Sequence, residues 1–212
     1  MLADSPVSYW RLDDGSGTVA ADVQGANPGT YTGGAGVTLG SAGATTDSDT
    51  AITLDGSTGY VSVPDAASLH IVGDITIEAW VHPTDLLNFN MIVTKDLLNV
   101  ARPYEFRLDQ TTGKAVLLNQ AGVAVTATTG VAAGAWTHVA VTVAAGTATH
   151  YLNGAANGTG ASSASTDGGG PLLIGARADL AASQKFKGII DEVAIYNSAL
   201  SVTRLLAHFN AR

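Results

Sequence analysis

The chain has 212 residues, with 18 acidic and 10 basic side chains and a formal net charge of −8. This balance excludes the basic surface that binding to nucleic acid or to an anionic membrane requires. The absence of cysteine excludes disulfides, thiol catalysis and thiolate metal sites, and no apolar run reaches the roughly 18 residues that a spanning helix needs.

Short apolar runs separated by turn residues predict about twelve to fourteen strands and an all-β protein. The alternation is clearest in 74–83, where Ile75, Ile77, Ala79 and Val81 would share one face. In chain order, the predicted strands are 8–13, 29–34, two strands within 51–64, 74–83, 90–96, 104–109, 114–119, 123–128, 136–144, 149–154, 171–176 and a long one within 186–201.

One helix is predicted, over 202–210, because Ser201 can cap it and Leu205, Leu206 and Phe209 follow helical spacing. We expect this helix to pack against an edge of the protein. No repeat or linker divides the chain, since strand patterning resumes directly after the small polar stretch 160–170. Residues 1–212 are therefore predicted to form a single domain, a two-sheet antiparallel sandwich with one short C-terminal helix.

The long C-terminal strand contains two adjacent carboxylates in an apolar setting. Strict alternation would place Asp191 on the buried face with Val193 and Ile195, and Glu192 on the opposite face, exposed or ion-paired. A buried carboxylate must find a cation, several N–H donors or a proton. From the residues alone, a basic partner (Arg11, Lys185 or Lys187), local N–H groups and a metal ion all remain open.

Seven stretches in fixed order give the chain a family resemblance. They are SYWRLDDGSGTVAADVQGANPGTYTGG, ITLDGSTGYVSVPD, ITIEAWVHP, AWTHVAVTV, HYLNG, LLIGAR and FKGIIDEVAIYNSALS. Together they resemble a laminin-G-like domain of the concanavalin A-like jelly-roll type, in its bacterial and phage form. The resemblance implies a jelly-roll sandwich, a calcium ion near the chain ends, and binding of carbohydrate or protein without catalysis.

The resemblance also implies which residues would hold that ion. The N-terminal loop ADVQGANPGT and the DE strand would supply Asp22, Asn27, Thr30 and Asp191 as ligands of a structural Ca²⁺, whereas Glu192 is not expected to be a ligand. Calcium binds six to eight oxygens, mixing carboxylates with carbonyls, so these residue types suit it. The acidic stretches at 14–17 and 46–49 lack the full calcium-loop pattern and are predicted to be turns.

The carboxylates do not predict an active site. Glycoside hydrolysis needs two carboxyl groups across the scissile bond. Glu78 stands alone on its strand face, and Arg107 would lie between Glu105 and Asp109, which indicates a surface salt-bridge ladder. No histidine pairing typical of zinc hydrolases occurs either. We therefore expect no enzyme activity.

Two polar loops are the candidate ligand-binding segments. One contains Asn88, Phe89 and Asn90, and the other leads to Arg102 and Tyr104. Since both flank the same predicted strand, we expect them to converge at one rim and expose aromatic and polar groups. The alternative is that they are ordinary solvated connections.

These observations predict a calcium-containing recognition module for extracellular or cell-surface carbohydrate. The alternatives are a protein-binding or structural module of a phage tail or bacterial adhesin and, third, a glycan-active enzyme. We expect a glycan or an extracellular protein as partner, no nucleic acid and no membrane insertion. The first residues lack a secretory-signal pattern. We therefore expect one part of a larger multidomain protein, secreted, on a cell surface or in a phage virion.

Overall fold

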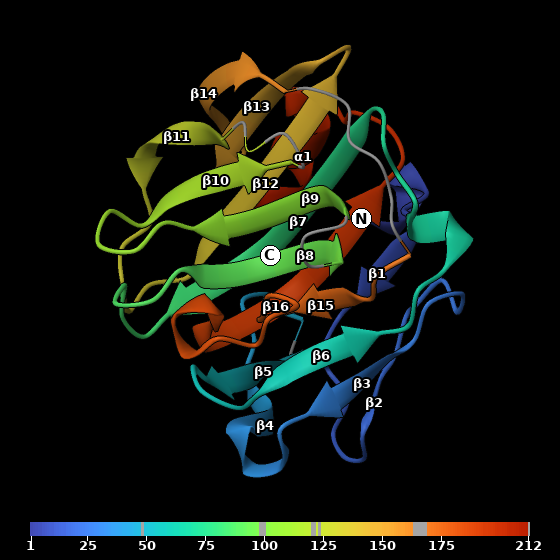
Figure 1. The fold of residues 1–212 in the computed structure, drawn as a ribbon, viewed down its shortest axis with the longest axis vertical. Helices are drawn as coiled ribbons and strands as arrows, with labels where there is room; N and C mark the ends of the chain where they lie inside the picture. Colours follow the sequence, from blue (N-terminus) through green and yellow to red (C-terminus); the bar gives the residue numbers. More distant parts are fainter. Residues whose placement is uncertain (48, 98–100, 120–121, 123, 163–168, 212) are drawn as a thin grey trace.

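The computed structural model describes residues 1–47, 49–97, 101–119, 122, 124–162 and 169–211, which form two antiparallel sheets packed face to face (Figure 1). In spatial order, sheet A consists of β14 (Ala155–Ala161), β13 (Thr147–Leu152), β12 (Thr137–Ala144), β7 (Ile75–Pro83), β16 (Lys187–Tyr196), β5 (Thr50–Asp55) and β4 (Val37–Ala42), with β1 (Ser8–Trp10) also pairing with β16. Sheet B consists of β11 (Ala124–Gly130), β10 (Lys114–Leu118), β9 (Ala101–Leu108), β8 (Asn90–Leu97), β15 (Leu172–Ile174), β6 (Tyr60–Val63), β3 (Gly29–Thr32) and β2 (Val19–Ala20).

The hydrophobic core fills the space between the two sheets. Ile75, Ile77, Ala79 and Val81 of β7 all belong to it, which confirms the face predicted from alternation. Sheet B contributes residues such as Phe106, whose side chain is fully buried. This pattern of inward apolar and outward polar positions gives the two-sheet jelly-roll sandwich that the sequence predicts.

Helix α1 spans Val202–Asn210, as predicted, and the Ser201 hydroxyl accepts a hydrogen bond from Arg204 N at 3.4 Å. The helix contacts β14, the edge strand of sheet A, as expected, and it also covers neighbouring strands. Leu205 contacts Ala140 and Tyr151, so the helix lies on the outer face of sheet A. The structure contains no helix among its described residues that could cross a membrane.

Three strands were not predicted from the sequence, namely β2, β4 and β14. β4 (VTLGSA) and β14 (AANGTGA) are rich in small and polar residues and therefore carry a weak strand signal. The stretch 51–64 does form two strands, but β5 belongs to sheet A and β6 to sheet B. The turn between them thus carries the chain from one sheet to the other.

A β-bulge in β16 decides where its two carboxylates point. Asp191 pairs with Trp80 and Ala194 with Glu78, so one extra residue interrupts the ladder, and Glu192 adopts a left-handed φ of 54°. Val193 belongs to the core. Asp191 instead lies on the outer face with Trp80, so the predicted grouping of Asp191 with Val193 and Ile195 is wrong. A bulge reverses the two-residue alternation beyond it.

The neighbours of β16 leave a gap at this bulge. On one side β7 pairs along most of the strand. On the other side β5 pairs with its first part, up to Ile190, and β1 pairs with its later part, from Val193. Asp191 and Glu192 therefore lie at the junction of β5 and β1, where other groups can approach them.

Candidate metal centre and its surroundings

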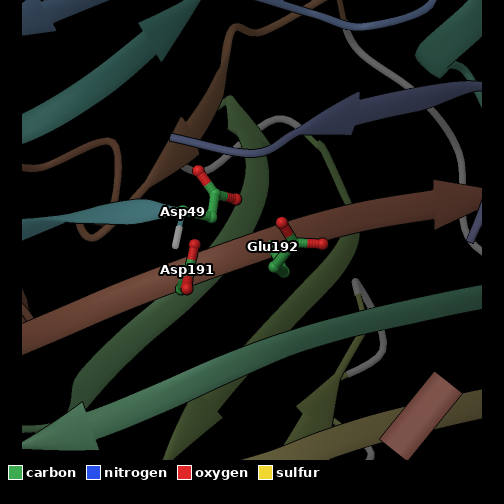
Figure 2. Close-up of side chains that lie close together, drawn as sticks. All are labelled: Asp49, Asp191 and Glu192. Carbon is green, nitrogen blue, oxygen red and sulfur yellow. The ribbon is translucent and has the colours of Figure 1, made fainter. Parts of the chain in front are cut away.

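Three carboxylates meet at the β5–β1 junction. Figure 2 shows Asp191 and Glu192 next to each other on β16, with Asp49 beyond them on the segment that leads into β5. One oxygen from each of the three lies within 4.8 Å of the others, and the two β16 side chains are buried. No other group of three or more such side chains with this spacing occurs among the described residues.

Arg11 and Tyr9 partly satisfy this cluster. The Arg11 Nε donates to Asp49 Oδ2 at 3.0 Å and to Glu192 Oε1 at 3.3 Å. The Tyr9 hydroxyl donates to Glu192 Oε2. Glu192 is thus ion-paired, as one predicted alternative had it, but it is buried and not exposed.

The carboxylate of Asp191 has fewer hydrogen-bond partners than those of Asp49 and Glu192. Its Oδ2 accepts a hydrogen bond from Ala44 N at 2.8 Å, whereas its buried Oδ1 has no hydrogen-bond partner among the described residues. Neither predicted lysine pairs with it, because Lys187 bonds to Asp85 and Lys185 lies over the Tyr60 ring. A buried acceptor without a partner loses its hydration and gains nothing in return.

The electrostatics follow from this geometry. Burial raises the pKa of Asp191 to about 7, against the lowering effect of the Ala44 N–H. Burial also raises the pKa of Glu192 to about 8, and the nearby Asp191 charge adds to the rise. Two adjacent carboxyl groups that resist ionisation are the arrangement that a bound cation would relieve.

The cluster fits a divalent cation in both charge and ligand type. Three carboxyl groups share one guanidinium, that of Arg11, which also pairs with Asp47, so the ionised cluster carries an excess of negative charge that a divalent ion would offset. All the offered ligand atoms are oxygens, as Ca²⁺ prefers, and the free Oδ1 of Asp191 is an available acceptor. Asp191, Glu192 and Asp49 are the residues that would hold such an ion.

The loop residues predicted as calcium ligands have other partners. The Asp22 carboxylate accepts hydrogen bonds from Tyr9 N (2.9 Å), Gln24 N (3.0 Å) and Asn27 N (2.9 Å). The Asn27 carbonyl accepts from the Trp10 indole at 2.9 Å. Asp22 and Asn27 therefore fasten their loop to β1 by direct hydrogen bonds, and Asp22 does not belong to the acidic cluster.

Thr30 lies in a different part of the protein from Asp191. It is an exposed residue of β3, paired with Val19 and with Ser62 of β6, in sheet B. Asp191 belongs to sheet A. The expectation that Thr30 and Asp191 share a site is therefore wrong, because the two residues belong to opposite sheets.

The first predicted ligand-binding loop is tied to its surroundings. Asn90 is fully buried in β8, where its Nδ2 donates to Asp85 O at 3.1 Å and its Oδ1 accepts from Lys187 N at 2.8 Å. The half-buried Asn88 donates to Gly56 O at 3.4 Å. The ring of Phe89 is covered by the Arg107 guanidinium, 4.3 Å from its centroid. The side chains of this loop thus contact other parts of the protein, which indicates a structural role.

The second loop does not join the first. Tyr104 is a buried residue of β9, and its hydroxyl donates to Leu69 O at 3.1 Å. The two segments flank β8 in sequence and so lie at its opposite ends, and the expected convergence is wrong. Residues 98–100 of the second segment lie outside the described residues.

Arg102 belongs instead to a ladder of charged groups on the outer face of sheet B. Its Nε lies 3.3 Å from Glu105 Oε2, and the Arg107 Nη1 donates to Glu105 Oε1 at 3.0 Å. The predicted salt bridge between Arg107 and Glu105 is confirmed, but Glu105 is fully buried and the ladder is not a solvated one. Both Glu105 oxygens thus lie beside guanidinium groups.

Sequence reasoning missed Asp49 as a member of the acidic cluster. It belongs to the stretch TDSD at 46–49, which reads as a turn because it lacks the calcium-loop pattern. The acidic composition of that stretch is the one available signal. What brings Asp49 to Asp191 is the pairing of β5 with β16, which no local pattern encodes.

The two antiparallel sheets and their shared core define a jelly-roll sandwich. The chain matches the family Laminin_G_3, described as the Concanavalin A-like lectin/glucanases superfamily, over residues 55–205. The match covers most of the chain, which therefore belongs to this family. No curated protein sequence gives a significant match.

Several solved structures share the fold. Domain 4 of AbnA, a GH43 extracellular arabinanase from Geobacillus stearothermophilus in complex with arabinotriose, superposes with a TM-score of 0.75 at 22% identity, covering 95% of this chain and 97% of that domain. The binding domain of Paraclostridial Mosquitocidal Protein 1 gives 0.68 at 17% identity, covering 100% of this chain and 53% of that one. Trypanosoma rangeli sialidase gives 0.70 at 16% identity, covering 95% of this chain and 32% of that one.

Proposed function

We propose that this protein is a non-catalytic carbohydrate-binding module of a larger extracellular protein. The observation that carries the proposal is the domain-to-domain match with AbnA domain 4, whose structure was determined with arabinotriose. Almost the whole of each chain takes part in that match. Family membership supports the same class of function, since the family groups lectins with glucanases.

The outer face of sheet B supports a binding role over catalysis. A glycosidase needs one carboxyl group to donate a proton and a second to act as nucleophile or base. Glu105 has a guanidinium beside each of its oxygens, from Arg102 and from Arg107. Both oxygens of this fully buried carboxylate therefore face basic side chains of the protein and are not open to a scissile bond.

The first experiment measures binding and turnover on the same saccharides. Isothermal titration calorimetry of the protein against arabino-, xylo-, cello- and manno-oligosaccharides should give saturable binding to at least one series. Incubation with the same compounds and chromatography of the products should show no cleavage. Release of shorter oligosaccharides would overturn the non-catalytic part, and absence of binding to every series would overturn the carbohydrate-binding part.

The proposal includes a structural Ca²⁺ at Asp49, Asp191 and Glu192. The supporting observations are the three clustered carboxyl groups that share the Arg11 guanidinium and the unbonded Oδ1 of Asp191. A bound divalent ion would link β16 to the segment before β5 and neutralise the cluster. The chain's own part is to hold the three carboxylates together, through Arg11, Tyr9 and the Ala44 N–H.

The calcium experiment compares melting temperatures in excess chelator and in excess Ca²⁺. Binding to the folded state alone adds RT ln(1 + [L]/Kd), about 4 kcal/mol at 1,000 times Kd. Asp191→Asn should abolish most of the Ca²⁺-dependent shift. Asp22→Asn should lower the melting temperature equally with and without Ca²⁺, because Asp22 acts through backbone hydrogen bonds. Equal melting temperatures of the wild-type protein in chelator and in Ca²⁺ would contradict the proposed ion.

A further inference from the structure

A groove lies on the outer face of sheet B. It is separate from the acidic cluster, which belongs to sheet A. The chain after β15 folds back across this face, and the Thr94 hydroxyl donates to Ala176 O at 2.7 Å to hold it there. Between this segment and strands β6, β15 and β8 lies a cavity of about 390 Å³. Its lining residues are Tyr60, Ser62, Asp96, Leu97, Pro171, Leu173, Ala178 and Leu180.

A carboxylate in the wall of this groove has an unsatisfied oxygen. Asp96 is only 2% exposed, and its Oδ2 has no hydrogen-bond partner among the described residues. The nearest cation is the Arg102 Nε at 3.6 Å, which is also 3.3 Å from Glu105 Oε2. A buried acceptor left unbonded destabilises the protein, and a ligand N–H or O–H would offset that cost.

The lining of the groove also exposes apolar side chains. Leu180 is 44% exposed and holds a left-handed φ of 53°, a strained conformation for a side chain of this kind. Leu97 is 36% exposed at the same groove. A strained, exposed leucine and an unbonded carboxylate both cost free energy in the isolated protein. Both costs would fall if a ligand with an apolar face and hydrogen-bond donors occupied the groove that they line.

The charges around the groove favour a neutral ligand. Arg102 pairs with Glu105, Arg177 pairs with Asp179 and the Lys185 ammonium lies over the Tyr60 ring, so each of these cations already has a partner within the protein. Asp96 would repel a carboxylate placed in the groove. A sugar ring combines an apolar C–H face with hydroxyl donors, and the cavity volume lies within the roughly 300–1,000 Å³ usual for ligand sites.

We propose that this groove binds one neutral saccharide unit of a glycan chain. The C–H face of the ring packs against Leu173 and Leu180, and its hydroxyls donate to the Asp96 carboxylate, with the Ser62 and Tyr60 hydroxyls close by. The inference rests on the proposed carbohydrate binding and deepens it, because it assigns the site and excludes uronic acids as the preferred unit.

The test uses the neutral oligosaccharide that binds in the calorimetric series, with oligogalacturonate as the acidic comparison. Asp96→Asn and Leu180→Ala should each weaken binding roughly tenfold, the loss expected for one charged hydrogen bond or one apolar contact. Leu180→Gly should also weaken binding, yet keep or raise the melting temperature, because glycine relieves the left-handed backbone. Leu206→Ala, at an exposed leucine of α1 on the other sheet, should change Kd less than about twofold.

The outcomes separate this inference from the proposed function. If a neutral saccharide binds and its Kd is unchanged in both Asp96→Asn and Leu180→Gly, the assigned groove is wrong while carbohydrate binding stands. Tighter binding of oligogalacturonate than of the neutral chain would overturn the assignment of a neutral unit. If the wild-type protein binds no saccharide of the panel, both proposals fail.

Discussion

His208 of the C-terminal helix contacts Glu78 at the centre of sheet A, with its Nδ1 2.9 Å from Glu78 Oε1. The same ring reaches the N-terminal segment through Nε2, 2.7 Å from Asp4 Oδ2. Glu78 also bonds to His138 at 3.0 Å and to the Tyr196 hydroxyl at 2.7 Å. One buried network therefore joins both ends of the chain to the outer face of sheet A.

This network should make stability depend on pH. Burial opposes the charged form of His208, but hydrogen bonds and charge from Glu78 and Asp4 outweigh it and raise the pKa of His208. Its contribution is therefore fully present below its unfolded pKa of about 6.5 and is lost as pH rises through the folded value. His208→Gln should lower the free energy of unfolding by about 1–3 kcal/mol at pH 6, and by less at pH 9.

Urea unfolding from pH 5 to pH 9 measures that difference. His82→Gln is the matched control, since His82 is a half-buried strand histidine that contacts Trp136. An equal loss of stability at every pH in His208→Gln would contradict a role for the protonated ring.

Glu78 should give stability the opposite pH dependence, a loss as pH falls into the acid range. Burial alone would raise the pKa of Glu78, yet the hydrogen bonds from His138 and His208 lower it to about 2. Its contribution is present above its unfolded pKa of about 4.5 and is lost as pH falls toward 2. Acid unfolding followed by circular dichroism should therefore shift to higher pH in Glu78→Gln, and an unshifted acid transition would refute this role.

The acidic cluster should impose a second pH dependence that calcium removes. In chelator, the raised pKa values of Asp191 (about 7) and Glu192 (about 8) mean that the folded state retains protons which the unfolded state has lost. Stability should fall between about pH 4 and pH 8, by up to 1.4 kcal/mol per pH unit for each such proton.

Excess Ca²⁺ should flatten this slope, because the ion replaces the protons. Thermal unfolding across the same pH range, with and without chelator, tests the prediction. Asp191→Asn should flatten the slope in chelator as well, and a slope that Ca²⁺ leaves unchanged would count against the cluster as its source.

Asp22 should matter to folding without any ion. Asp22→Ala removes the acceptor of three backbone N–H groups and should lower the free energy of unfolding by about 2–4 kcal/mol in chelator. Asp74→Ala is the control, because Asp74 accepts one backbone N–H, that of Ala145, at 2.9 Å. Chemical denaturation curves compare the two, and an equal effect would show that the loop does not depend on Asp22.

Gly188 of β16 lies close to the backbone of the neighbouring strand β7, which leaves no room for a side chain. Its φ is 138°, and an added Cβ would lie 2.3 Å from His82 O, so Gly188→Ala should cost about 3 kcal/mol or more. Gly15→Ala, where an added Cβ meets nothing within 4 Å, should change stability by less than about 0.5 kcal/mol. Similar melting temperatures for the two variants would contradict this account of β16.

Local patterns in the sequence were enough to predict most strands, the inward face of β7 and the limits of α1. These features depend on side-chain period and capping, which residues a few positions apart decide. The same patterns marked Asp191 as a carboxylate that needs a partner. They also predicted the pairing of Glu105 with Arg107, since residues two apart on a strand share a face.

Tertiary structure alone decided which groups meet at each site. The bulge at Glu192 moved Asp191 to the outer face, and the meeting of β5 and β1 along β16 brought Asp49 and Arg11 to it from distant positions. The fold-back after β15 likewise placed Leu180 in the same groove as Asp96. Strand register, sheet assignment and loop path depend on contacts between residues far apart in the chain, so the two-residue alternation of one strand carries no record of them.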